Sequence, residues 1–148
     1  MEYLGDIVSP TFYFTDLEID YFHKILANHT IFKPQSTLLL QCPDQIKKIS
    51  HYEHMQILYH NYPGSRIGHY IAVHFFFGVL HIYDSLNTNH LHKDIITYTD
   101  RLFGKPLSVQ FHKVQQQTNG FDCGPFAIAF ITSLNLGKYN LLSFFFSY

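Results

Sequence analysis

The sequence lacks a surplus of either charge and has no long block of like charges. Lysine and arginine number 10, aspartate and glutamate number 11, and the formal net charge is −1 with neutral histidines. Nucleic acids and anionic membrane surfaces attract proteins that carry a strong basic excess. The composition gives no electrostatic argument for either partner, and we expect neither.

A leader segment and a membrane-spanning run are missing too. The opening residues, MEYLGDIVSPTF, have neither the basic nor the apolar region of a secretory signal, and no apolar run approaches the roughly 18 residues that cross a bilayer. We therefore expect an intracellular protein of the nucleus or cytoplasm. Cysteine is scarce: Cys42 and Cys123 are the whole supply, and a reducing compartment keeps both as thiols.

Hydrophobic residues, by contrast, are plentiful. They make up 47% of the 148 residues, against 14% that are charged, which is typical of one compact domain spanning residues 1–148. Near its start, Leu17, Tyr21 and Ile25 recur at helical spacing behind a side-chain acceptor. This pattern predicts a helix from residue 15 or 16 to about residue 28.

Short elements are predicted along the rest of the chain. Apolar runs at 36–41 and 56–60 are typical of buried strands, and a proline and a glycine punctuate a loop over 61–65. Two segments rich in β-branched and aromatic residues flank Gly78 closely enough to form an antiparallel hairpin. The later predictions are a helix over 93–103, a strand over 107–114 and a helix over 125–134 that is apolar on nearly every side.

The setting of Cys123 raises the question of a nucleophile. If Pro125 takes the first position of the last helix, Cys123 lies just before the helix N-terminus, among unpaired backbone N–H groups that favour a thiolate. Gly124 would leave room for a substrate backbone beside the sulfur. The alternative is a small buried hydrophobe, the usual role of a free cysteine. Cys42 has no comparable setting, and we interpret it as structural.

A nucleophilic cysteine needs an imidazole base, which in turn needs an orienting partner, and the hairpin supplies both. With Phe77-Gly78 as a two-residue turn, Ile71 lies opposite Asp84, and His69 becomes a diagonal neighbour on the same face. A register shifted by one residue would put His69 and Asp84 on opposite faces.

Other histidines of the hairpin fit the role of base less well. His74 is interpreted as a partly buried, hydrogen-bonded residue, and the side chain of His81 is expected to point away from the face of Asp84.

Gln117 and the remaining histidines leave two further alternatives. The Gln117 amide could donate to an oxyanion together with the backbone N–H of Cys123, or it could belong to a solvated polar stretch. A metal site on His51 and His54, or on His90 and His92, is a weak alternative, because HYEH is not the HExxH arrangement of zinc proteases. We expect no metal and no cofactor.

Taken together and in order, these residues resemble the active-site pattern of a known family. The family is that of the ubiquitin-like-protein-specific cysteine proteases, which includes the SUMO (sentrin) proteases and, as a more distant relative, adenovirus protease. The resemblance is carried by three segments: His69-Tyr70, Tyr83-Asp84-Ser85 and QTNGFDCG, which ends in Cys123-Gly124. The resemblance covers roughly residues 66 to 134. It implies a papain-like α+β fold in which a central helix carries the nucleophile and packs on a small sheet. The elements predicted above agree with that layout.

The resemblance also implies a role for each residue. Cys123 would be the nucleophile, His69 the general base, Asp84 its orienting partner and Gln117 the oxyanion donor, while Tyr70 and Gly124 would contact the substrate. The implied activity is cleavage after the terminal Gly-Gly of a ubiquitin-like protein such as SUMO by a monomeric enzyme that needs no metal.

Two departures from the family keep alternatives open. Many members have a tryptophan after the histidine, which roofs the tunnel for Gly-Gly, but this chain has no tryptophan and carries Tyr70 there. Only 25 residues follow Cys123, so the resemblance leaves open a truncated domain end. The alternatives are a polyprotein-processing protease of a virus or mobile element, and a weak or inactive module that binds a ubiquitin-like tail.

Overall fold

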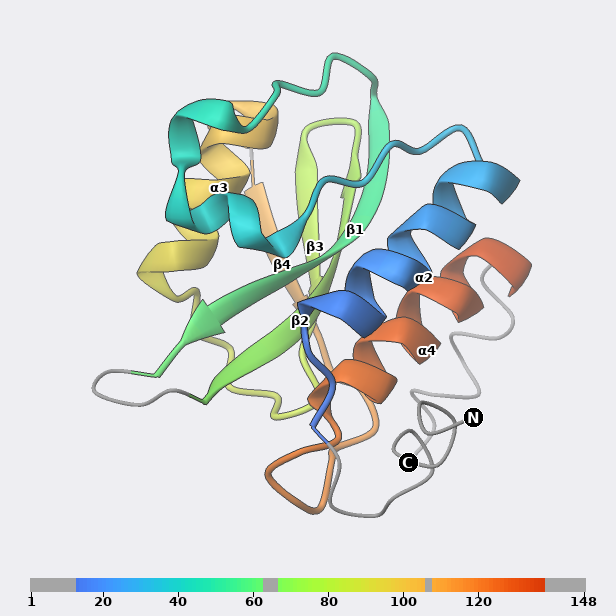
Figure 1. The fold of residues 1–148 in the computed structure, drawn as a ribbon, viewed down its shortest axis with the longest axis vertical. Coiled ribbons are helices and arrows are strands. Elements are labelled where there is room, and N and C mark those ends of the chain that lie inside the picture. Colours follow the sequence, from blue (N-terminus) through green and yellow to red (C-terminus); the bar gives the residue numbers. More distant parts are fainter. Residues whose placement is uncertain (1–12, 63–66, 106–107, 138–148) are drawn as a thin grey trace.

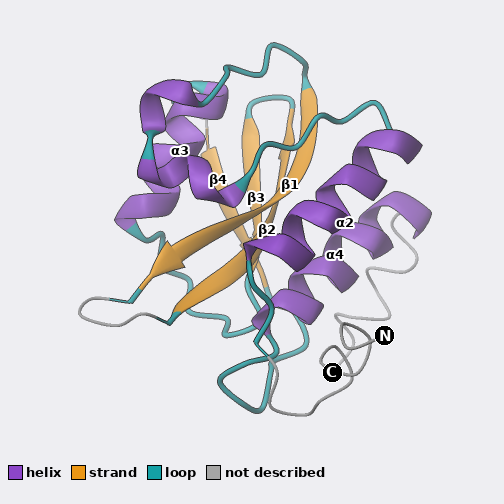
Figure 2. Cartoon of the chain, in the orientation of Figure 1, coloured by secondary structure: helices purple, strands orange, loops and turns teal. Residues whose placement is uncertain are grey.

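The computed structural model describes residues 13–62, 67–105 and 108–137. In these residues a four-stranded mixed sheet, ordered β1-β2-β3-β4, lies between helices α2 and α4 on one face and α3 on the other (Figures 1 and 2). The fold is α+β, as predicted. The elements are α2 Asp16–His29, β1 Glu53–Asn61, β2 Gly68–Phe76, β3 Val79–Tyr83, α3 Lys93–Phe103, β4 Ser108–His112 and α4 Cys123–Gly137, with short 3-10 helices η1 Thr37–Gln41 and η2 Pro43–Gln45.

Helix α2 confirms the first predicted helix, but two of the apolar residues that predicted it lie outside its buried face. Thr15 caps the helix and forms a capping box with Glu18. Leu17 and Tyr21 are 66% and 65% exposed, and the buried face carries Ile19 and other residues instead. Apolar spacing alone does not reveal this face, because two polar side chains of the helix, including that of Glu18, are buried.

The second of these polar side chains, that of His23, gives the protein a defined response to acid. Burial and nearby His54 lower the pKa of His23 to about 3, and its Nε2 accepts the Ile57 N–H at 2.9 Å, so the folded protein keeps this ring neutral. The unfolded chain binds a proton here below about pH 6.5. The free energy of unfolding should therefore fall by about 1.4 kcal/mol per pH unit from this residue as the pH drops from 6.5 towards 3.

Urea unfolding at several pH values between 5 and 7 measures that slope. His23→Gln is expected to reduce the slope by this amount, whereas His29→Gln, at an exposed position of the same helix, should leave the slope unchanged. An equal slope in both variants would contradict the assignment.

The predicted hairpin is confirmed, together with its two-residue turn. Phe76 pairs with Val79, and Phe77 and Gly78 take positive φ angles of 46° and 80°, as in a type I′ turn. The strand predicted over 56–60 is the central part of β1, which pairs antiparallel with β2. The helix predicted over 93–103 is α3, and β4, which follows it, pairs parallel with β3. The predicted loop over 61–65 lies mostly outside the described residues.

The strand predicted over 36–41 is wrong, because this segment forms the 3-10 helix η1. The Ser36 side chain accepts the Leu38 N–H at 3.2 Å and so caps a turn instead of an extended strand. The Cys42 N–H closes the same helix on the Leu39 carbonyl at 3.0 Å. A local acceptor and the following proline therefore outweigh the apolar run.

The core has two layers because the strands are buried on both faces. Along β1, Ile57 packs towards α2 and α4, and Leu58 packs towards α3. Helix α4 contributes Phe130 and Ile131 to the first layer, as its nearly uniform apolar sequence predicts. Among the described residues, no helix has the length and apolar character needed to cross a membrane.

Candidate active site

The hairpin brings His69 and Asp84 into direct contact. His69 is the second residue of β2, and Asp84 follows the last residue of β3, where Ala72 pairs with Tyr83. The His69 Nε2–H donates to Asp84 Oδ1 at 2.6 Å, and the two residues are 2% and 7% exposed. The predicted register and the predicted contact are therefore both present.

Asp84 is held as a carboxylate by several donors. Burial raises its pKa, but hydrogen bonds from His69 and the Leu86 backbone, together with the positive charge of His69, lower the pKa to about 2. The Leu86 N–H donates to Oδ1 at 2.9 Å, and the Thr88 hydroxyl donates to Oδ2 at 2.8 Å. These bonds fix the carboxylate and so orient the imidazole.

The pKa of His69 is raised by its neighbours in the site. Burial lowers its pKa, but the hydrogen bonds to Asp84 and Cys123 and the charges of these groups outweigh burial and raise the pKa to about 9. The ring is therefore an imidazolium at neutral pH. Because Nε2 is bonded to Asp84, Nδ1 is the nitrogen left for the sulfur.

Cys123 is the first residue of α4, with 5% of its surface exposed. The Phe126 N–H donates to the Asp122 carbonyl at 3.0 Å, so the helix starts two residues earlier than predicted and Pro125 takes its third position. The missing N–H of proline is tolerated throughout the first turn, whose N–H groups have no intrahelical partner. The sulfur still lies at the positive end of the helix, as expected.

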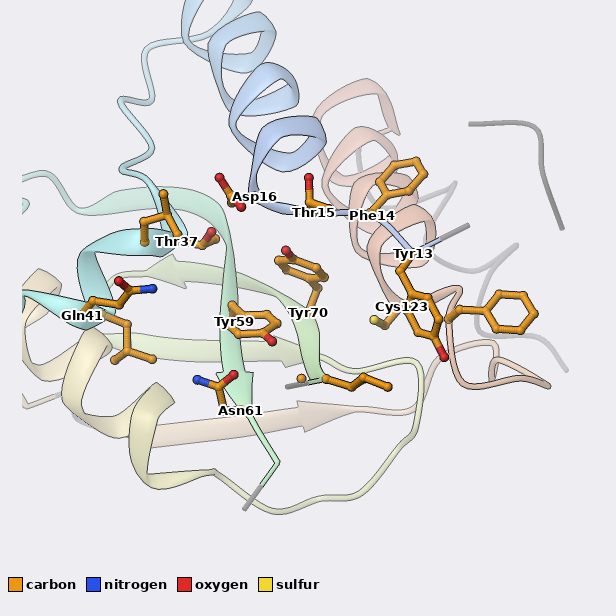
Figure 3. Close-up of a pocket in the computed structure, with 15 residues that line it drawn as sticks. Tyr13, Phe14, Thr15, Asp16, Thr37, Gln41, Tyr59, Asn61, Tyr70 and Cys123 are labelled. Atoms are coloured by element: carbon orange, nitrogen blue, oxygen red, sulfur yellow. The ribbon is translucent and has the colours of Figure 1, made fainter. Parts of the chain in front are cut away.

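A cavity of about 390 Å³ opens beside the sulfur. In Figure 3 the Cys123 sulfur points towards the space in front of the Tyr59 and Tyr70 rings, whose centroids are 4.8 Å apart. Asp16 and Thr37 lie towards the other end of this space. The cavity therefore has an aromatic wall next to the sulfur and a more polar far end.

Gln117 is buried, which contradicts the alternative of a fully solvated stretch. It is 6% exposed, whereas its neighbours Gln115 and Gln116 are exposed. Its Oε1 accepts the Ser85 hydroxyl, and its Nε2 donates to the Asn119 carbonyl at 2.7 Å. One N–H of the amide remains after that bond. Its role as an oxyanion donor stays a prediction.

The two predicted substrate contacts have different surroundings. Tyr70 lines the cavity. Burial is the main cause of the raised pKa of its hydroxyl, and the nearby Tyr59 hydroxyl and Asp16 carboxylate raise this pKa further. The space beside Gly124 is filled: a Cβ there would lie 2.6 Å from the Cβ of Phe14. The room expected for a substrate backbone is occupied by this side chain, so packing explains the glycine. Substrate contact by Tyr70 and Gly124 stays a prediction.

The hairpin histidines outside the site have partners of their own. The His74 Nε2 lies 2.9 Å from Glu53 Oε1, which confirms a mostly buried, hydrogen-bonded residue. The His81 Nδ1 lies 2.8 Å from His112 Nε2, away from Asp84.

In the described part of the chain, no group of three or more histidine, cysteine or acidic side chains is arranged to hold a metal ion. The pairs His51/His54 and His90/His92 thus gain no support as metal sites.

Sequence reasoning missed His60, which lies directly beside the base. It pairs with His69 across β1 and β2, with ring centroids 5.5 Å apart, and stacks on His92 at 4.3 Å. Burial and the two neighbouring rings lower the pKa of His60 to about 4, so it adds no charge beside the imidazolium at neutral pH. Its place in a predicted strand was visible, but the register of β1 on β2 was not.

No protein-family model matches the chain, and no curated protein matches it.

Proposed function

We propose that the chain is a cysteine peptidase with Cys123 as its nucleophile. The observation that carries the proposal is the placement of His69: one nitrogen bonds to Asp84 at 2.6 Å, and Cys123, at the start of α4, is near enough to help raise the pKa of the ring. The sulfur borders an open cavity of about 390 Å³, which gives a substrate access. An ion pair of thiolate and imidazolium is the reactive form of such a site.

The reaction proceeds in two steps. The Cys123 thiolate attacks the substrate carbonyl carbon, a C–S bond forms, and the resulting oxyanion faces the backbone N–H groups at the start of α4 and the Gln117 amide. The intermediate then collapses: the C–N bond breaks, and the leaving amine takes the proton from His69 Nδ1. In the second step water loses a proton to His69 and attacks the thioester, the C–S bond breaks, and the acid product leaves.

The proposed substrate is a ubiquitin-like protein such as SUMO, cleaved after its terminal Gly-Gly in a precursor or a conjugate. The order of His69, Asp84, Gln117 and Cys123 supports this choice through the family resemblance, and the papain-like fold belongs to the same proposal. The cavity beside the sulfur has rings on its wall, where a residue without a side chain fits most easily. A polyprotein of a virus or mobile element would offer similar small residues.

A module that binds a ubiquitin-like tail without cleaving it is the second candidate. Two observations favour it: Cys123 is only 5% exposed, and Phe14 fills the space beside Gly124. Such a module would use the same cavity, so binding alone does not separate the candidates. The reactivity of the sulfur does.

Ubiquitin-like probes with a C-terminal electrophile test the proposal. A SUMO or ubiquitin probe is expected to form a covalent adduct at Cys123, because the sulfur attacks the electrophile at the position of the scissile carbonyl. Mass spectrometry of the digested adduct identifies the labelled residue. Cys123→Ala should abolish labelling, and Cys42→Ala, which removes the other thiol, should leave it intact.

Two outcomes would overturn peptidase action. Tight binding of the probe body without an adduct would identify the non-cleaving module, and labelling at Cys42 would show unspecific alkylation. Labelling by a probe built on a polyprotein cleavage sequence, but by no ubiquitin-like probe, would keep the chemistry and change the substrate.

A further inference from the structure

An exposed aromatic pair lies at the end of the sheet opposite the Cys123 end. Tyr52 directly precedes β1 and is 57% exposed; Phe77, in the β2–β3 turn, is 65% exposed. Their rings stack with centroids 4.9 Å apart, and the Phe77 N–H donates to the Tyr52 carbonyl at 2.8 Å. Figure 1 shows this turn and the start of β1 at the same end of the molecule, while α4 begins at the other end.

The backbone of Phe77 is costly at this position. Its φ of 46° is in the left-handed region, where a residue with a Cβ loses about 1–2 kcal/mol relative to the right-handed conformation. Asparagine, aspartate or glycine would fit the first position of a type I′ turn at lower cost. Burial does not offset the strain, since most of the ring is exposed. Strain of this kind, at an exposed aromatic residue, points to a binding role.

A small hollow with a partly apolar lining lies at the same end of the sheet, because Glu53, the first residue of β1, belongs to its lining. It has a volume of about 140 Å³, and its lining includes Ile31, Phe32, Ile49 and His51. Phe32 is 7% exposed and belongs to the core, while Ile31 at the rim is 69% exposed. His51 directly precedes Tyr52 in the chain, and we call the hollow and the aromatic pair together the distal surface.

The distal surface is positively charged. Lys33 and Lys48 line the hollow, both are exposed, and neither has an ion-pair partner within the residues that the structure describes. Lys47 beside them is likewise exposed and without such a partner. The one acidic residue in the lining, Glu53, is already bonded to His74 at 2.9 Å. The lysines are therefore free to pair with a negatively charged ligand.

We propose that the distal surface binds an acidic peptide segment that carries a large apolar side chain. The apolar side chain would fill the hollow and pack on Tyr52 and Phe77, while the acidic flanks would pair with Lys33 and Lys48. A concave hollow with a buried floor fits a single side chain better than the flat surface of a membrane. The opposite charges account for the choice of an acidic partner.

This binding is separate from the proposed peptidase reaction. The nine residues of β1 run from the distal surface towards the cavity, a length of roughly 26 Å at the usual rise of a strand. None of the residues that line the hollow lines the cavity at Cys123. The distal surface therefore holds a partner, or a remote part of a substrate, while the cavity stays open.

Fluorescence polarisation of a labelled octapeptide tests the proposal on the full chain. The peptide has Ile-Phe at its centre with three acidic residues on each side; a second peptide has serines for Ile-Phe, and a third has lysines for the acidic residues. Only the first is expected to bind. The Lys33→Glu/Lys48→Glu variant should weaken its affinity by at least about tenfold, whereas Lys24→Glu/Lys93→Glu, with the same charge change at exposed positions elsewhere, should not.

Phe77→Gly provides a second variant that protects against a folding artefact. Glycine adopts positive φ readily, so this variant should have a Tm no lower than that of the unchanged chain and yet bind the peptide about tenfold more weakly. Cys123→Ala should bind it normally. If Phe77→Gly and the lysine variant both bound the peptide as tightly as the unchanged chain does, the proposal would be overturned. So would binding to vesicles containing phosphatidylserine without binding to the peptide, which would identify a membrane surface.

Discussion

Asp84→Asn is expected to slow the acylation of Cys123 by roughly 10³–10⁴-fold at neutral pH, the scale found when the carboxylate of such a triad becomes an amide. Burial lowers the pKa of His69, and the next largest influence, the hydrogen bond that the ring donates to Asp84, raises it. Without the carboxylate the pKa of His69 falls from about 9, and the imidazolium that stabilises the thiolate is lost. The rate of probe labelling as a function of pH measures the effect.

A titration of His69 by NMR separates this cause from misfolding. Its midpoint should move to lower pH in Asp84→Asn, while the dispersion of the other resonances is kept. Asp94→Asn is the matched control, because Asp94 Oδ2 lies 3.6 Å from the ring of His92 and not beside His69. A native labelling rate in Asp84→Asn would refute the role of the carboxylate, and an equal loss in Asp94→Asn would indicate a general structural effect.

The same substitution changes the pH dependence of stability in a known direction. The pKa of His69 is raised in the folded state, so its contribution is fully present below about pH 6.5 and is lost as the pH rises through about 9. The pKa of Asp84 is lowered, so its contribution is present above about pH 4 and is lost as the pH falls towards 2. Asp84→Asn should therefore lower the free energy of unfolding most between about pH 4 and about pH 6.5, where both contributions are fully present.

The contact between His69 and Asp84 could be predicted because it depends on local rules. A two-residue turn at Phe77-Gly78 fixes the register of its strands, and the period of two along each strand fixes which side chains share a face. The apolar sequence of α4 in the same way predicted a helix behind Cys123. Its first residue was placed too late because proline is also tolerated at the third position.

Contacts between distant parts of the chain could not be predicted in this way. Gln117 is buried because it meets Ser85, 32 residues earlier, and nothing in a run of glutamines indicates that partner. His23 is buried because its ring accepts the N–H of Ile57 on β1. Apolar periodicity would count His23, a polar residue, as facing solvent. Phe14 packs against Gly124 across more than a hundred residues. In each case a contact between residues far apart in the sequence, and not the type of the residue, decides how the residue is buried or packed.

Gly68 is another position of this kind, and Gly68→Ala is expected to destabilise the protein by about 1–3 kcal/mol, as overpacking does. An added Cβ would lie 2.2 Å from the His60 carbonyl oxygen and 2.2 Å from the Tyr59 hydroxyl. The tyrosine ring can turn away, but the carbonyl belongs to the paired backbone of β1. Denaturant unfolding measures the loss. Gly120→Ala is the matched control, since the nearest atom to its Cβ is 4.0 Å away.

The consequence for the site follows from the register of β1 and β2. Gly68 pairs with Asn61, and the next pair is His60 with His69, so relief of the clash by separating the strands displaces the base itself. Gly68→Ala should therefore also lower the rate of probe labelling. The double variant Gly68→Ala/Tyr59→Ala removes the ring but keeps the carbonyl, and it should recover neither stability nor labelling. Full recovery would mean that the Tyr59 ring, and not the pairing of the two strands, requires the glycine.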